Sequence, residues 1–350
     1  MSRIPWVCRV VALLALPVCV PAWAAEAPHS VTRAELVMGS IARITIDEGA
    51  SAVAFDAAFD AFRAVDASMS LYRPASSLVR VNAHAATHAE PVDEALFDCL
   101  ARAQALSAAT AGAFDVTVLP LLRAWGAYPE LSYLSAGRVD AVGWGGLLLD
   151  PAARAVRFRR DGMGIDLGGI AKGFALDRAR TALAAAGARR ALLDLGGNLA
   201  LLGAGPGRGW RVAVTDPAAP AETLGVLTLA AGDTVATSGN YARDFAHEGW
   251  KTQSHIFDPR TGRAVRAKLA VTVWGPDATT VDALSTALLV LGPDGAGTVL
   301  AREPTVGALF VDDATPTRRL LMVGRPPRGF EAAKNHLAVI ASAMRTESAR

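Results

Sequence analysis

Three segments of this sequence combine residue types that could do chemistry on a phosphorylated ligand. The first is Asp166-Leu-Gly-Gly-Ile-Ala-Lys-Gly173, where a strand-like stretch ends in two glycines and an amphipathic helix follows. Free backbone N–H groups and the positive end of the helix dipole meet at such a turn, and Lys172 adds a charge, so the segment suits a phosphate. It is neither a Walker A loop nor a dinucleotide fingerprint. A packing turn between strand and helix is the alternative.

The second segment places Asp282 and Thr286 four residues apart within a stretch of helical periodicity, 281–291. On a helix this spacing puts both side chains on one face, where their oxygens can reach one cation. A carboxylate, a hydroxyl and backbone carbonyls are ligands that suit Mg²⁺, which often bridges a diphosphate. The alternative is structural: an aspartate favoured by the helix dipole near the N-terminus and a threonine bonded to its own helix.

The third segment begins at His255 and enters a turn that contains Pro259 and Gly262. Histidine titrates near neutral pH, so a loop histidine can act as a general base, although many are only hydrogen-bonded surface residues. Ser238 ends another strand-like stretch, but that stretch lacks the preceding glycine of a serine-nucleophile elbow. We therefore expect Ser238 to line a cleft and not to act as a nucleophile.

The three segments lie in a chain that is expected to contain both strands and helices. Strand-like stretches outnumber helical ones and often follow one another directly, so the sequence predicts an α+β fold with a mixed β-sheet core and flanking helices. The expected strands are 36–46, 156–158, 164–167, 191–195, 210–215, 225–229, 234–238 and 270–274, and the expected helices are 52–68, 94–111, 170–186 and 281–291. With 52% apolar residues among 350, the chain can bury a large core.

The first 24 residues differ in kind from the rest. Two arginines precede an apolar run over 10–18, and small residues flank Trp23, which is typical of a secretory signal peptide. Cleavage after Ala24 would leave 25–350 as one exported, periplasmic domain of two closely packed sub-regions with the active site between them. A competing interpretation takes the segment ending at Cys19 as a lipobox, whose acylation would anchor the protein to the inner membrane.

Charge and cysteine content exclude other classes. Lys and Arg number 35 against 33 Asp and Glu, and the basic residues are scattered, so no general electrostatic affinity for nucleic acid is expected. Cys8 and Cys19 lie in the leader, so the processed soluble chain would keep only Cys99. One thiol cannot form an internal disulfide, and the helical apolar pattern around Cys99 predicts a buried core residue.

Eight segments, taken together and in order, resemble the ApbE family, the FAD:protein FMN transferases. They extend from about residue 35 to 310, and the Gly-Gly-Ile-Ala-Lys-Gly and His-Ile-Phe-Asp-Pro blocks are the most specific. The segments are Met38-Gly-Ser40, Ser70-Leu-Tyr72-Arg-Pro74, Ala113-Phe-Asp-Val-Thr117, Asp166-Leu-Gly-Gly-Ile-Ala-Lys-Gly173, Leu195-Gly-Gly-Asn198, Thr237-Ser-Gly-Asn-Tyr241, His255-Ile-Phe-Asp-Pro259 and Asp282-Ala-Leu-Ser-Thr286.

The resemblance implies a T-fold-like architecture and a Mg²⁺-dependent enzyme with FAD as its substrate. Such an enzyme attaches FMN through its phosphate to a threonine or serine of an acceptor flavoprotein and releases AMP. By position, Asp282 and Thr286 would bind the metal through their side chains and Ala171 through its carbonyl. His255 would deprotonate the acceptor hydroxyl. The FAD site would be lined by Met38, Tyr72, Ala113, Phe114, Asp115, Gly168, Gly169, Lys172 and Phe174.

Some positions depart from the family pattern. Many relatives have threonine where Ser40 stands and an acidic residue where Asn240 stands, so the first change keeps a hydroxyl and the second removes a charge. No family motif matches the residues after about 325. The amphipathic pattern of 334–350 predicts a docking helix whose very end is disordered.

Two other functions stay open at this point. An FAD pyrophosphatase would use the same metal and FAD site but direct water to the phosphorus, giving free FMN and AMP. A non-catalytic exported FAD-binding protein would need neither His255 nor the pair Asp282 and Thr286. A covalent flavin on an acceptor would exclude the first, and consumption of FAD would exclude the second.

Overall fold

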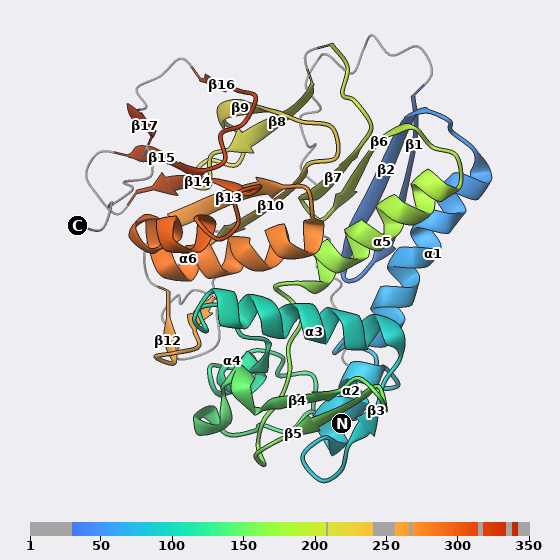
Figure 1. The fold of residues 1–350 in the computed structure, drawn as a ribbon, viewed down its shortest axis with the longest axis vertical. Helices are drawn as coiled ribbons and strands as arrows, with labels where there is room; N and C mark the ends of the chain where they lie inside the picture. The colour runs from blue at the N-terminus through green and yellow to red at the C-terminus, as the bar shows by residue number, and fades with distance from the viewer. Residues whose placement is uncertain are drawn as a thin grey trace, which may run out of the picture.

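The computed structural model describes residues 30–207, 209–240, 256–265, 269–313, 318–333 and 338–341. The predicted signal peptide, Cys19 and His255 therefore lie outside the described residues. Within them the predicted α+β class is confirmed, because helices flank a central sheet whose neighbouring strands are mostly antiparallel (Figure 1).

The central sheet has nine strands in the order β1-β2-β6-β7-β10-β13-β14-β15-β17. Every neighbouring pair is antiparallel except β15 and β17, which run parallel. The bounds are β1 Val31–Val37, β2 Ser40–Glu48, β6 Arg190–Leu195, β7 Asn198–Leu202, β10 Thr234–Gly239, β13 Leu269–Gly275, β14 Gly307–Asp312, β15 Arg319–Gly324 and β17 Ala338–Ala341.

Three strand and helix predictions are wrong. The single strand expected over 36–46 is a hairpin, because Met38 and Gly39 adopt left-handed φ angles of 53° and 67° and reverse the chain. No strand forms over 164–167, because the backbone of Ile165 bonds to the side chain of Asn82 and not to another strand. The docking helix expected over 334–350 is contradicted at 338–341, which pair with β15 as a strand.

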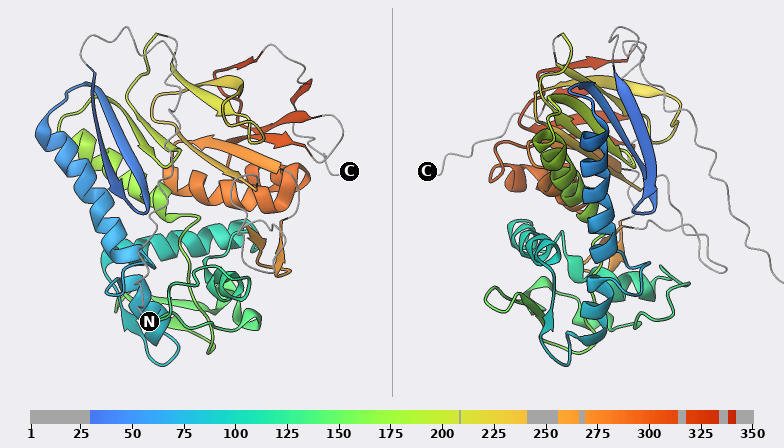
Figure 2. Two further views of the ribbon diagram at one scale, coloured as in Figure 1. Left: turned by 180° about the vertical axis from the view of Figure 1, so that it is seen from behind. Right: turned by 90° about the vertical axis from the view of Figure 1, so that its right-hand side faces the viewer.

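Three helices cover one face of the sheet (Figures 1 and 2): α1 Ala52–Met69, α5 Ala171–Ala185 and α6 Ala278–Leu300. Ser51 begins α1 by accepting a hydrogen bond from the N–H of Ala54, as an N-cap should. By length and composition α6 could cross a bilayer, but it is kinked at Gly292 and its first part is buried against β10 and β13. It is a core helix in this structure.

The other face of strands β7, β10, β13, β14 and β15 is covered by a small sheet of order β16-β9-β8, with bounds β8 Trp210–Thr215, β9 Thr223–Leu229 and β16 Gly329–Ala332. Side chains alternate between the two faces of the large sheet, as in any strand. On β13, Val273 joins the core beneath the helices while Trp274 joins the core beneath the small sheet. Both faces of the central strands are therefore buried.

The remaining elements form a layer beyond α5 and α6, on the side away from the large sheet (Figures 1 and 2). In it α3 lies next to α6, with α4 and a three-stranded sheet of order β3-β5-β4 beyond. The bounds are α2 Ser77–His84, β3 Glu90–Pro91, α3 Glu94–Ala109, α4 Leu119–Ala124, β4 Leu147–Asp150, β5 Ala155–Phe158, β11 Phe257–Asp258 and β12 Arg263–Ala264. Most of the segments singled out in the sequence meet where this layer faces α5 and α6.

Candidate functional site

The start of α5 and the second turn of α6 touch at Gly173. A Cβ atom at this position would lie 2.1 Å from the carbonyl oxygen of Ala278 and 2.7 Å from the Cβ of Asp282, so only glycine fits. Its N–H donates a 2.9 Å hydrogen bond to Oδ2 of Asp282. The last glycine of the first predicted segment therefore holds the predicted metal carboxylate directly.

Asp282 is buried, with 3% of its surface exposed, and both carboxylate oxygens accept hydrogen bonds. Oδ1 accepts one of 2.8 Å from Nδ2 of Asn198, which begins β7. The N-cap of α6 is Asp277, so Asp282 lies a full turn inside the helix and is not a dipole-stabilising residue at its first turn. A buried carboxylate held by two neutral donors is a favourable place for a cation.

Thr286 faces the glycine turn that precedes α5. A Cβ atom at Gly169 would lie 3.1 Å from Oγ1 of Thr286 and 3.3 Å from the ring of Phe114, so three predicted site residues converge there. Because Thr286 follows Asp282 by one helical turn, both oxygens lie on the α5 side of α6. In the structure the glycine segment therefore lies against the face of α6 that carries Asp282 and Thr286.

Asp177, further along α5, caps α6. Its carboxylate accepts hydrogen bonds of 3.0 Å and 2.8 Å from the N–H groups of Ala278 and Thr279. Arg102 of α3 contacts both Asp177 and Asp277, so one guanidinium joins α3 to the start of α6. These charges fix the end of the helix that carries Asp282.

Asp166 shapes the turn before α5. Its Oδ1 accepts a 2.7 Å hydrogen bond from the N–H of Gly168, and its Oδ2 accepts one of 2.6 Å from the hydroxyl of Tyr128. Burial raises the pKa of Asp166, although these hydrogen bonds and the charge of Lys172 oppose the shift. Lys172 is the second residue of α5 and follows this turn directly.

Asp115 connects two segments of the chain through hydrogen bonds. The carboxylate accepts hydrogen bonds from the N–H of Thr117 and the N–H of Trp144, each of 2.8 Å. Burial raises the pKa of Asp115, and these hydrogen bonds oppose the shift. Asp115 thus ties the segment from Ala113, itself 1% exposed, to the residues that precede β4.

Met38 is partly buried and Tyr72 is exposed, and we call the place of these two residues, outside the buried contacts around Asp282, the rim. Tyr72 is 60% exposed, and its ring meets that of Tyr128 edge-on, with centroids 5.9 Å apart. The hairpin turn at Met38 lies beside the β6–β7 turn, because a Cβ atom at Gly196 would come within 2.4 Å of the hydroxyl of Ser40. The Met38 turn joins β1 and β2 of the large sheet, whereas the rings of Tyr72 and Tyr128 precede α2 and follow α4 in the other layer.

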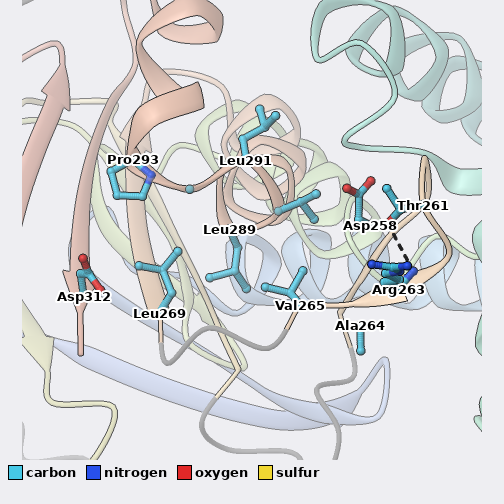
Figure 3. A pocket seen from close by; sticks show the side chains of 12 residues that line it. Asp258, Thr261, Arg263, Ala264, Val265, Leu269, Leu289, Leu291, Pro293 and Asp312 are labelled. Carbon is cyan, nitrogen blue, oxygen red and sulfur yellow. Dashed lines mark hydrogen bonds between the residues drawn. The ribbon is translucent and has the colours of Figure 1, made fainter. Parts of the chain in front are cut away.

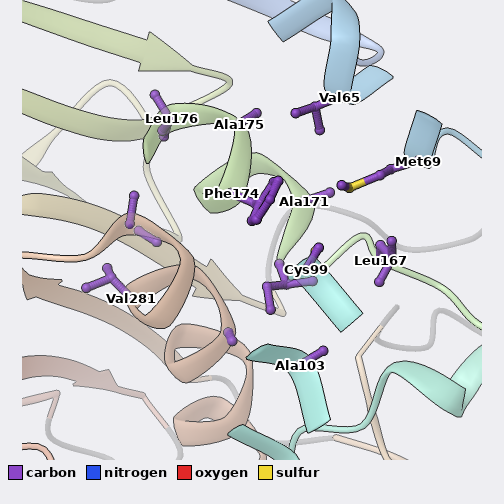
Figure 4. Packing of buried hydrophobic residues seen from close by; sticks show 14 of the residues in the cluster. Val65, Met69, Cys99, Ala103, Leu167, Ala171, Phe174, Ala175, Leu176 and Val281 are labelled. Carbon is purple, nitrogen blue, oxygen red and sulfur yellow. The ribbon is translucent and has the colours of Figure 1, made fainter. Parts of the chain in front are cut away.

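Phe174 does not face the cluster around Asp282. Its ring is 5% exposed and lies among Val65, Met69 and Cys99 in the core between α1, α3 and α5 (Figure 4). Helix periodicity turns this side chain toward α1, away from the residues that meet at Gly169, and its predicted contact with FAD stays a prediction. Cys99 is fully buried, as predicted.

His255 itself lies outside the described residues, but the hairpin that follows it is described. Phe257 of β11 packs on Leu121 of α4, and the side chain of Arg260 lies 3.6 Å from where a Cβ of Gly112 would be. The hairpin therefore lies against the segment that leads to Ala113 and Phe114.

Two cavities lie outside this cluster. One of 410 Å³ lies between the β11–β12 hairpin and the kink of α6, with Asp258 and Leu289 in its wall (Figure 3). Another of 730 Å³ lies between α1, α3 and α5 and includes Phe174. Apart from Phe174, neither contains a predicted FAD or metal residue, so we define the candidate site by the contacts around Asp282. In the described part of the chain no three His, Cys, Asp or Glu side chains gather as a metal cluster.

Sequence reasoning missed two residues of this cluster. Asn198 stood in a recognised motif, and only the fold shows that it reaches Asp282. Tyr128 belonged to no motif, and its contact with Asp166 spans 38 residues, so no local pattern could have revealed it.

Comparisons with known proteins identify the family. A sequence model of the ApbE family matches residues 38–310. The chain belongs to the ApbE family. Among curated members, the FAD:protein FMN transferase of Escherichia coli K12 is 33% identical over 249 residues, which cover 68% of this chain and 71% of the relative. That of Treponema pallidum is 31% identical over 304 residues, covering 80% and 84%.

Solved ApbE structures share the fold. The ApbE protein of Thermotoga maritima superposes with a TM-score of 0.71 at 28% identity, covering 87% of this chain and 97% of the other. The flavin transferase ApbE of Vibrio cholerae gives a TM-score of 0.71 at 26% identity, covering 84% and 97%. The predicted family is therefore confirmed from both sequence and fold.

Proposed function

We propose that this chain is an FAD:protein FMN transferase. The hydroxyl oxygen of a threonine or serine on an acceptor protein attacks the phosphorus on the FMN side of FAD. A new phosphoester bond forms, the diphosphate P–O bond breaks, and AMP leaves. The observation that carries the proposal is the meeting of Gly173, Asn198 and Asp282, three residues from three family segments, in one buried hydrogen-bonded unit.

Mg²⁺ is part of the proposal, and the residues present fit it. Asp282, Thr286 and the carbonyl of Ala171 offer only oxygen atoms, and a single carboxylate is what Mg²⁺ commonly takes from a protein when substrate phosphates complete its shell. Ala171 begins α5 two residues before Gly173, whose N–H bonds to Asp282. When bound there, Mg²⁺ would neutralise charge on the phosphoryl oxygens.

The chain's own residues supply the rest of the mechanism. The positive end of the α5 dipole and the charge of Lys172 bind the diphosphate. Tyr72 and Met38, at the rim, bind a flat ring of FAD. His255 accepts the proton of the acceptor hydroxyl, because an unactivated hydroxyl is a poor nucleophile.

We also propose that the enzyme acts after export to the periplasm. The leader over 1–24 supports this location, and its lipobox alternative would add an anchor at Cys19. The acceptor would then be an exported flavoprotein, reached by the same route.

The decisive experiment is in-gel flavin fluorescence of a denatured acceptor. The processed protein is mixed with FAD, Mg²⁺ and an acceptor domain from an exported flavoprotein, with and without EDTA, beside the variant Asp282→Asn. We expect a fluorescent acceptor band that EDTA removes and that the variant forms weakly. FMN and AMP in solution without a band would indicate a pyrophosphatase, and FAD that returns intact would indicate a binding protein.

A further inference from the structure

We propose that Tyr128 is a positioning residue that links the two ends of the FAD site. Its hydroxyl fixes the turn that begins the phosphate-binding segment, and its ring supports Tyr72 at the rim. The inference rests on the proposed function, in which Tyr72 binds a flat ring and the segment after Asp166 binds the diphosphate. It concerns a residue outside every family segment recognised in the sequence.

The hydroxyl contact is specific. Asp166 is 8% exposed, and its two oxygens accept from the Tyr128 hydroxyl at 2.6 Å and from the N–H of Gly168 at 2.7 Å. The hydrogen bond from Tyr128 therefore orients the carboxylate, and the carboxylate in turn holds the N–H of Gly168 in the glycine turn. A hydrogen bond to a buried carboxylate is charge-assisted, so it constrains geometry more than a neutral one.

The backbone of Tyr128 is held in an unusual conformation. Its φ angle is +57°, in the left-handed region that bulky residues rarely adopt. The carbonyl of Tyr128 accepts hydrogen bonds from the guanidinium of Arg123 and from the N–H of Leu131, which keep it there. Strained residues held by their surroundings concentrate at functional sites, and here the strain aims the side chain at Asp166.

The ring contact joins the same residue to the rim. The rings of Tyr72 and Tyr128 meet at 78° with centroids 5.9 Å apart, a T-shaped pair. The hydroxyl of Tyr133, from the same segment, donates to the carbonyl of Leu71, so the backbone before Tyr72 is fixed as well. Burial and then the nearby charge of Glu130 raise the pKa of Tyr72, which keeps its phenol neutral.

One side chain therefore sets the distance between the place where a ring would stack and the place where a diphosphate would bind. Loss of the Tyr128 hydroxyl alone should disturb the turn after Asp166, where the diphosphate would bind, and leave the ring contact with Tyr72 intact. Loss of the ring should disturb both. This separation gives the inference a test that a general loss of stability cannot imitate.

The test compares Tyr128→Phe and Tyr128→Leu in the processed full-length protein. The dissociation constant for FAD is measured from flavin fluorescence without acceptor, and kcat and KM are measured for transfer. For Tyr128→Phe we expect kcat to fall by about 10–100-fold, the scale of a misplaced reacting group, with FAD affinity within about threefold of wild type. For Tyr128→Leu we expect FAD affinity to fall as well, by about 3–10-fold, because an aromatic pair is lost.

A double-mutant cycle with Asp166→Asn shows whether the hydroxyl acts through Asp166. Asparagine keeps the shape of the side chain, and Asp166→Asn alone should reproduce much of the loss in kcat. Adding Tyr128→Phe to it should then change kcat by less than about twofold, since the link is already broken. Wild-type kcat in Tyr128→Phe, or losses that simply add, would overturn the proposal. A wild-type protein that binds FAD but transfers nothing would refute the proposed function instead, and the affinities of the two Tyr128 variants would still decide the ring contact.

Discussion

Asn198 and Asp282 are joined by a buried 2.8 Å hydrogen bond, although 84 residues separate them in the chain. Gly173 donates to the other carboxylate oxygen from the opposite helix. The carboxylate is thus oriented from two sides by neutral donors, and each of its oxygens has a second lone pair for a cation. Partners that orient a metal ligand in this way commonly affect metal affinity by 10–100-fold.

Asn198→Asp should make stability depend on Mg²⁺ more strongly than in wild type. The new carboxylate lies against Asp282, so repulsion lowers the melting temperature in EDTA, and Mg²⁺ relieves that repulsion. Thermal unfolding with EDTA and with Mg²⁺ measures both effects. Asn198→Ala is the control, since it leaves a buried oxygen unpaired and should cost about 1–3 kcal/mol without any added charge. Equal Mg²⁺-induced shifts in all three proteins would argue against a cation at Asp282.

Gly173→Ala should destabilise the protein by about 3 kcal/mol or more, because the added methyl overlaps the backbone of α6. Activity should be lost along with it, since Asp282 must move away from α5. Gly297→Ala is a matched control in α6, where a Cβ meets no atom within 4 Å. That variant should gain about 0.5–1 kcal/mol from helix propensity. Denaturant unfolding compares the two, and similar values would show that the α5–α6 contact is looser than the structure has it.

His255→Ala should keep FAD binding and lose transfer by about 10²–10⁴-fold, the range for removal of a general base. His84→Ala, at the end of α2, serves as the control and should transfer FMN at the wild-type rate. Fluorescence titration of FAD and the in-gel assay give the two readouts. Undiminished transfer by His255→Ala would remove histidine as the base.

Cys99 should be unreactive in the folded protein. Burial raises the pKa of its thiol to about 12, so almost none of it is the reactive thiolate at pH 8. At pH 8 the native processed protein should give no reaction with DTNB, and the denatured protein should release one equivalent. The unprocessed chain has three cysteines, so a higher count would reveal a retained leader. Rapid reaction of the native protein would mean that the core around Cys99 opens readily.

Local pattern predicted most of the fold. The bounds of α1 and α5 agree nearly to the residue with the helices expected over 52–68 and 170–186, because helix signals are contained within one stretch of chain. The Met38 turn was missed because a methionine in a left-handed conformation gives no signal, unlike a glycine pair. The run at 164–167 has a strand's composition but bonds to a side chain, which no local pattern reports.

The site was predicted in part for a similar reason. The spacing of Asp282 and Thr286 predicts that they share a helix face and the glycine pair predicts a turn at Gly169, and the structure has both features; ligand binding by these residues stays a prediction. Membership of a motif does not say which way a side chain points, and the ring of Phe174 lies in the core between α1, α3 and α5. Asn198 and Tyr128 act through partners far along the chain, and a single sequence does not contain that information.

The contacts that build the site have a consequence for the order of folding. Gly173 and Asp282 are 109 residues apart, and Asp177 caps a helix whose first residue lies 101 residues later. Closing loops of this length costs chain entropy before any contact compensates for it, so such contacts form slowly. A nascent chain that has not yet produced α6 therefore lacks both Asp282, the partner of Gly173, and the helix start that Asp177 caps. Catalytic competence should appear in a refolding experiment only with the last, slowest phase.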